Sequence, residues 1–179
     1  MYKRIFFVSY FLFLLFFPSL LFAQSPDKEM TLTLVIPQAH NFSERQIYKR
    51  FDNKPNFHVL LKNISNKSER IWQEICSSGY ENLYFELEVN GKKILIQKSP
   101  KDWSKNYPDY LTINPGEYIV FDVYITTDEW GGLPKVTEKT PVKIKAIYET
   151  KEIPLKNSKS YNVWSGKIES QTLDVSIYP

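Results

Sequence analysis

The chain has 179 residues, with 23 basic and 20 acidic side chains and a single cysteine, Cys76. This length is enough for one domain with its own core. One cysteine excludes an internal disulfide, so packing must stabilise the fold. The lysines are interspersed with acids rather than gathered in a basic stripe, which argues against nucleic-acid binding.

The N-terminus has the pattern of an export signal. Lys3 and Arg4 precede an uncharged run, rich in Phe and Leu, that ends at Ala23. A basic head, an apolar stretch and a small final residue predict a signal peptide over residues 1–23, cleaved after Ala23. The alternative is an uncleaved membrane anchor, because about 20 apolar residues can span a bilayer. We therefore expect one domain over residues 24–179, located in the periplasm, at the cell surface or outside the cell.

Short stretches in which apolar and polar residues alternate run through the rest of the chain, as expected for strands that bury one face. The predicted strands cover residues 30–36, 57–64, 69–75, the hairpin 82–97, 111–113, 118–126, 142–148 and 172–178. Ser43 and Gln46 match a capping box, which predicts one or two helical turns over residues 43–50. A further strand there is the alternative.

Two turns are predicted from their residue types. The hairpin at residues 82–97 has Asn90-Gly91 at its centre, and both residues tolerate the positive φ of a type I′ turn. Pro115-Gly116 predicts a type II turn, because Pro sets the first φ and Gly accepts the positive second φ.

These elements predict an all-β fold. Regularly spaced short strands in a chain of this size indicate an immunoglobulin-like two-sheet antiparallel β-sandwich of about eight strands, preceded by the signal helix. Half-polar alternation favours two sheets that pack face to face and are solvated outside. The side chains expected between the sheets are Phe85, Leu87, Phe121, Val123, Ile144 and Val175.

The succession of motifs between Leu60 and Ile125 resembles bacterial immunoglobulin-like domains, including the small proteinase-inhibitor domains of Bacillus type. The motifs are Asn63-Ile64-Ser65, Ser78-Gly79-Tyr80, Asn90-Gly91-Lys92 and the segment from Leu111 to Glu117. Trp164-Ser165-Gly166 looks like the closing segment of exported bacterial domains of this shape. The resemblance implies the fold, and it assigns no inhibitory loop residue to this chain.

Residues for catalysis or metal binding are few. The chain contains two histidines, His40 and His58, which with Cys76 do not have zinc-ligand spacing or the local signature of a cysteine hydrolase. A glycine-rich phosphate loop and a Gly-x-Ser-x-Gly serine motif are also missing from the sequence. We therefore predict no enzyme activity, no metal and no cofactor.

Aromatic residues in the predicted loops are the candidates for binding. Trp103, Tyr107, Tyr110 and Trp130 lie between predicted strands, as does Trp164. Exposed aromatic rings bury large area at low entropic cost, so the first four could form one patch that stacks a glycan or anchors a protein. The alternative is that these rings fold back and cap the core.

The function expected from these features is that of a non-enzymatic exported binding or structural module. It would act through its loops or through a sheet edge on an unknown protein or glycan. Membrane contact would come only through an uncleaved signal segment. A proteinase-inhibitor-like domain is the alternative among binding proteins, and a small secreted hydrolase is the alternative from another class.

Overall fold

The computed structural model describes residues 29–37, 45–48, 57–126, 128–150 and 161–179, and all structural statements below refer to them. The predictions for the signal segment, for His40 and for Ser43 lie outside these residues. In this part of the chain, no helix is long and apolar enough to cross a membrane.

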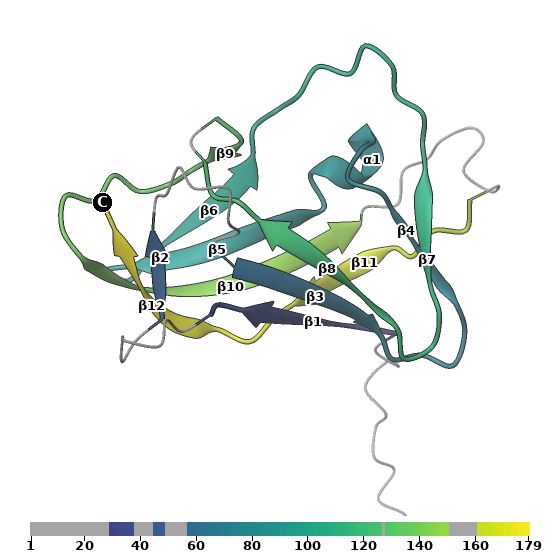
Figure 1. Cartoon of the computed structure of the whole chain (residues 1–179), viewed down its shortest axis with the longest axis horizontal. Coiled ribbons are helices and arrows are strands. Elements are labelled where there is room, and N and C mark those ends of the chain that lie inside the picture. The colour runs from purple at the N-terminus through teal and green to yellow at the C-terminus, as the bar shows by residue number, and fades with distance from the viewer. Residues whose placement is uncertain (1–28, 38–44, 49–56, 127, 151–160) are drawn as a thin grey trace, which may run out of the picture.

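The described residues are almost entirely strands, which confirms the all-β class (Figure 1). The elements are β1 (Met30–Val35), β2 (Gln46–Tyr48), β3 (Phe57–Asn63), β4 (Glu69–Trp72), α1 (Ser77–Tyr80), β5 (Leu83–Val89), β6 (Lys92–Lys98), β7 (Tyr110–Ile113), β8 (Tyr118–Val123), β9 (Trp130–Gly131), β10 (Thr140–Thr150), β11 (Gly166–Glu169) and β12 (Leu173–Tyr178). Every strand predicted from alternation is present, with ends that differ by a few residues.

The described strands form three hydrogen-bonded sheets. One has the order β1-β3-β8, the largest has the order β2-β12-β10-β5-β6-β9 with β11 also paired to β10, and the third is β4-β7. All pairs are antiparallel except β2–β12, which is parallel. A turn separates β3 from β4 and another separates β7 from β8, so β3 pairs with β8 in one sheet and β4 pairs with β7 in the small third sheet.

Asn63 holds these two turns together. Its side chain is fully buried, and its Nδ2 donates to the carbonyls of Lys67 and Ile113 at 2.7 and 2.8 Å. Its Oδ1 accepts the Ser65 backbone N–H at 2.9 Å. Because buried amide groups must be hydrogen-bonded, this one side chain fixes where β3 ends and where β4 starts.

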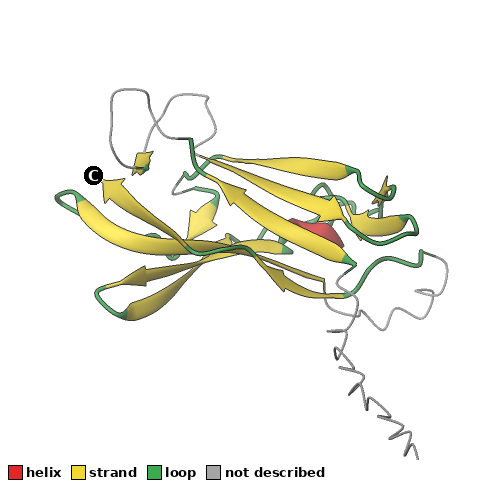
Figure 2. Ribbon diagram, turned by 90° about the horizontal axis from the view of Figure 1, so that it is seen from below, coloured by secondary structure: helices red, strands yellow, loops and turns green. Residues whose placement is uncertain are grey.

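The core lies between the β1-β3-β8 sheet and the largest sheet, which are stacked in Figure 2. Alternate residues of each strand point inward, and Phe57, Val59 and Leu61 of β3 are fully buried. The six predicted core residues are all less than 9% exposed, and Phe85 and Leu87 are fully buried. The burial predicted for these six side chains is therefore confirmed.

Both predicted turns are confirmed by their backbone angles. Asn90 and Gly91 have φ of 50° and 74°, as a type I′ turn requires. Gly116 has φ of 82°, and the Glu117 N–H donates to the Asn114 carbonyl at 3.0 Å, as in a type II turn.

Some predictions were wrong. Residues 46–48 are strand β2 rather than helix, because pairing with β12 and burial of Ile47 override the local helix signal, so the alternative of a further strand is confirmed there. Ile147 and Ser176 alternate with core residues of their strands, so they are expected to face outward, but both are buried. The short elements α1, β9 and β11 have no alternation pattern long enough to predict them.

Candidate functional site

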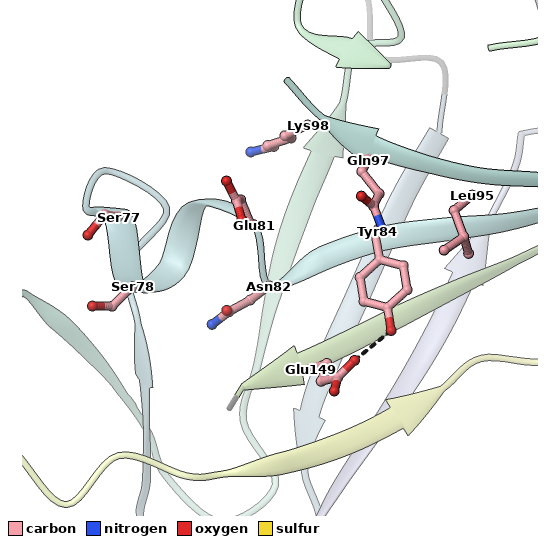
Figure 3. Close-up of a pocket in the computed structure, with 9 residues that line it drawn as sticks. All are labelled: Ser77, Ser78, Glu81, Asn82, Tyr84, Leu95, Gln97, Lys98 and Glu149. Carbon is pink, nitrogen blue, oxygen red and sulfur yellow. Dashed lines mark hydrogen bonds between the residues drawn. The ribbon is translucent and has the colours of Figure 1, made fainter. Parts of the chain in front are cut away.

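A pocket of about 380 Å³ lies where the outer face of the largest sheet meets α1 (Figure 3). Tyr84 of β5, Gln97 of β6 and Glu149 of β10 point outward from neighbouring strands, because they alternate with buried core residues. Other lining residues come from α1, from the turn after it and from β6, namely Ser77, Ser78, Glu81, Asn82, Leu95 and Lys98. The pocket is therefore built mainly on paired strands, which hold its side chains in place.

The position of α1 depends on a close backbone approach. A Cβ on Gly79 would lie 2.1 Å from the carbonyl oxygen of Gln73, so only glycine fits there. Cys76 precedes the helix, is 1% exposed, and its Sγ lies 3.1 Å from the same Gln73 carbonyl. The Ser77 N–H donates to Asn106 Oδ1 at 3.0 Å, which ties α1 to the long segment between β6 and β7.

Tyr84 and Glu149, which both line the pocket, are joined by a short hydrogen bond. The Tyr84 hydroxyl donates to Glu149 Oε2 at 2.6 Å. Burial, and then the hydrogen bond to Glu149, raise the pKa of Tyr84 well above its usual value. Beside this pair, the Asn82 amide is 8% exposed and donates to Thr150 Oγ1 at 3.1 Å. This part of the pocket therefore presents hydrogen-bonding groups that are held by their partners: the neutral Tyr84 and Asn82, and the acidic Glu149.

Lys98 occupies the end of the pocket that faces the core. Its side chain is only 7% exposed, and its Nζ lies 2.8 Å from Glu74 and 3.8 Å from Glu129. The same ammonium lies over the rings of Tyr80 and Trp130, at 4.7 and 5.7 Å from their centroids. These partners compensate a buried charge that would otherwise be costly.

Two of the four predicted aromatic residues lie near this lysine, Trp130 in contact with its ammonium and Trp103 in contact with the Tyr80 ring. Trp103 packs edge-on against Tyr80, with centroids 5.6 Å apart, and Lys101 lies over the Trp103 ring at 5.1 Å. Trp130 contacts Lys98 from the other side. We call Tyr80, Lys98, Lys101, Trp103 and Trp130 the cation–aromatic cluster. Trp103 is half-buried, and neither Trp103 nor Tyr80 is among the residues that line the pocket.

Trp130 itself takes the core-capping position that was the alternative for these rings. It is 3% exposed and packs against Phe85 with centroids 5.3 Å apart. A Cβ on Gly132, at φ 84°, would lie 2.0 Å from the Leu95 carbonyl oxygen, so the glycine permits this inward fold. The Trp130 ring therefore offers no open face to a ligand in this structure.

The other predicted residues lie elsewhere. Tyr110 is in contact with Arg70, whose guanidinium is 4.6 Å above its ring, and with Tyr161 at 6.2 Å. Tyr107 is 77% exposed on the segment between β6 and β7. Trp164 packs on the buried Tyr148 at 6.2 Å. The predicted single patch is thus divided among different surroundings, and the binding role of Trp103, Tyr107 and Tyr110 stays a prediction.

The residues considered for a hydrolase have separate partners. His58 lies on the outer face of β3, where its Nδ1 is 2.7 Å from Asp122 Oδ1. Cys76 lies beneath α1 against backbone carbonyls. Among the described residues, no group of three His, Cys, Asp or Glu side chains could hold a metal ion.

The pocket was missed by sequence reasoning, although part of its signal was present. Alternation in the hairpin puts Tyr84 and Gln97 on the same outward face, so their proximity could have been inferred. The contribution of α1 could not, because Ser77 meets Asn106 through tertiary contacts between segments 29 positions apart.

Comparison with known proteins finds no matching family model, no matching curated protein and no matching solved structure. The site must therefore be interpreted from its own geometry.

Proposed function

We propose that this protein is a non-enzymatic, exported binding module on an immunoglobulin-like two-sheet β-sandwich, and that its ligand occupies the pocket beside α1. The observation that supports this proposal is a pocket of about 380 Å³, lined mostly by polar side chains from paired strands, from α1 and from the turn after it. Its volume lies in the ~300–1,000 Å³ range that small-ligand sites have. Export rests on the sequence of residues 1–23.

The pocket is better suited to binding than to nucleophilic chemistry. Its hydroxyl groups include Tyr84, whose pKa is raised by burial and by Glu149, so that its phenol stays protonated and donates. A carboxylate that accepts from a phenol orients it and does not activate a nucleophile. The long segment between β6 and β7 is fastened to α1 through Asn106 and Trp103, which disfavours the protruding loop that a proteinase inhibitor needs.

A pair of tryptophan substitutions on one strand tests this proposal. Gln97→Trp would fill the pocket, whereas Lys93→Trp puts the same ring on the same face of β6 outside it. Both positions are exposed, and strands accept aromatic residues. Lys93→Trp also loses an ion pair with Glu86, but such a surface pair contributes little.

The measurement is retention of material from the host's own envelope fraction by the immobilised protein. Wild type and Lys93→Trp should retain the same molecule, and Gln97→Trp should lose it while keeping the wild-type unfolding midpoint. Equal retention by all three proteins would show that binding occurs elsewhere and would overturn the proposal.

A further inference from the structure

The pocket combines groups that recognise hydroxyl-rich molecules. Glu81 and Glu149 offer carboxylate oxygens that accept from two hydroxyls at once, and the Gln97 amide both donates and accepts. Ser78 adds a hydroxyl that can act in either sense. Since a sugar hydroxyl is also both donor and acceptor, these mixed groups can satisfy several neighbouring hydroxyls on one ring.

One side of the pocket is apolar. Leu95 is 48% exposed there, and the Tyr84 ring stands beside it on the neighbouring strand (Figure 3). The C–H face of a pyranose ring is apolar, so it can cover Leu95 and the aromatic edge while its hydroxyls meet the polar side.

The charge of the pocket restricts the ligand further. Among the lining residues that the structure describes, Lys98 alone is cationic, and it is already held by Glu74 and Glu129. Glu81 and Glu149 therefore leave the site acidic. An anionic group in the pocket would be repelled by these carboxylates, and Lys98 could not compensate it.

From these features we propose that the pocket binds a sugar residue that carries no acidic group, as part of a neutral or amine-bearing oligosaccharide. The inference rests on the proposed function and specifies the ligand of the same site. Glu81, Glu149 and Gln97 bind the hydroxyls, Leu95 and the Tyr84 ring contact the C–H face, and the two carboxylates exclude uronic acids.

Calorimetric titration tests the ligand class. The probes are neutral gluco- and manno-oligosaccharides, glucosamine oligomers and galacturonate oligomers of equal length, titrated at low ionic strength into the chain as its host processes it. We expect at least one neutral or amine-bearing oligosaccharide to bind, and galacturonate to bind about tenfold more weakly or not at all. Gln97→Trp should weaken the binding by about tenfold or more, and Lys93→Trp should leave it unchanged.

Glu81→Gln separates charge from shape. This change keeps an acceptor and removes one negative charge. The ratio of the affinity for the neutral sugar to the affinity for galacturonate should therefore fall by about threefold or more at low salt. Glu138→Gln is the matched control, because Glu138 is exposed and lies outside the pocket lining. Glu138→Gln should leave this affinity ratio unchanged.

The possible failures are distinguishable. Binding of galacturonate as tight as that of the neutral sugars would overturn the charge argument. If no oligosaccharide binds while Gln97→Trp still abolishes retention of envelope material, the ligand class is wrong and the proposed function stands. If Gln97→Trp and Lys93→Trp behave alike in both experiments, the proposed function itself fails.

Discussion

At the scale of single residues, the hydrogen bond from Tyr84 to Glu149 gives the clearest pH-dependent prediction. The pKa of Tyr84 is raised by burial and by Glu149, so the folded state favours the protonated phenol. This contribution to stability is complete below the unfolded tyrosine pKa of about 10 and is lost as pH rises through the higher folded pKa.

The comparison of wild type with Tyr84→Phe isolates that contribution. Near neutral pH, the variant should lose about 1 kcal/mol of unfolding free energy with the hydrogen bond. Above about pH 10 the difference should shrink, because the tyrosine then ionises in the unfolded wild type and this ionisation stabilises the unfolded state. Denaturant titrations from pH 7 to 11 measure this difference in unfolding free energy between the two proteins. A difference that grows with pH would contradict the assignment.

Gly132 carries a second residue-scale prediction. Gly132→Ala should destabilise the fold by at least about 2 kcal/mol, because a Cβ would meet the Leu95 carbonyl and φ is positive. The adjacent Gly131→Ala is the control, since its Cβ would lie 3.8 Å from the nearest atom, the Gln97 carbonyl oxygen, and should change stability by less than about 0.5 kcal/mol. Urea denaturation measures both, and equal effects would show that Trp130 does not depend on this glycine.

At the scale of elements, β8 tests the packing of the two sheets. Phe121 points inward, is 8% exposed and packs against Tyr148, whereas Val120 points outward and is 48% exposed. Phe121→Ala should cost about 3–5 kcal/mol through lost burial and a cavity. Val120→Ala should cost less than about 1 kcal/mol.

The two variants together define the register of the strand. A shift by one residue would exchange the two faces, so the larger loss would then belong to Val120→Ala. Unfolding midpoints in denaturant decide between the registers, provided that the slope of the transition is the same for both variants.

At the scale of the whole molecule, the sequence predicts that export removes the N-terminal segment. Protein recovered from envelope and medium should begin at Gln24 or within a few residues of it, because Ala23 ends the uncharged run. N-terminal sequencing or intact mass measures this. Recovery of chains that start at Met1 in the membrane fraction would favour the uncleaved anchor instead.

The sequence was sufficient where local patterns determine structure. Alternation placed Phe85 and Phe121 in the core, and Asn90-Gly91 fixed a turn, because each depends on neighbouring residues alone. The burial of Trp130 and the pocket were not predictable in this way. Both depend on where distant segments pass, as when a lysine of β6 meets rings from α1 and β9.

Cys76 makes the proposed site observable by chemical labelling. Its thiol is buried beneath α1, and it is the single cysteine of the chain. A thiol reagent can therefore react only when this region opens, and its labelling rate reports the free energy of local opening. A ligand that binds across α1 and the strands should slow labelling in proportion to its occupancy. The chain thus carries its own probe for ligands, which needs no substitution or added fluorophore.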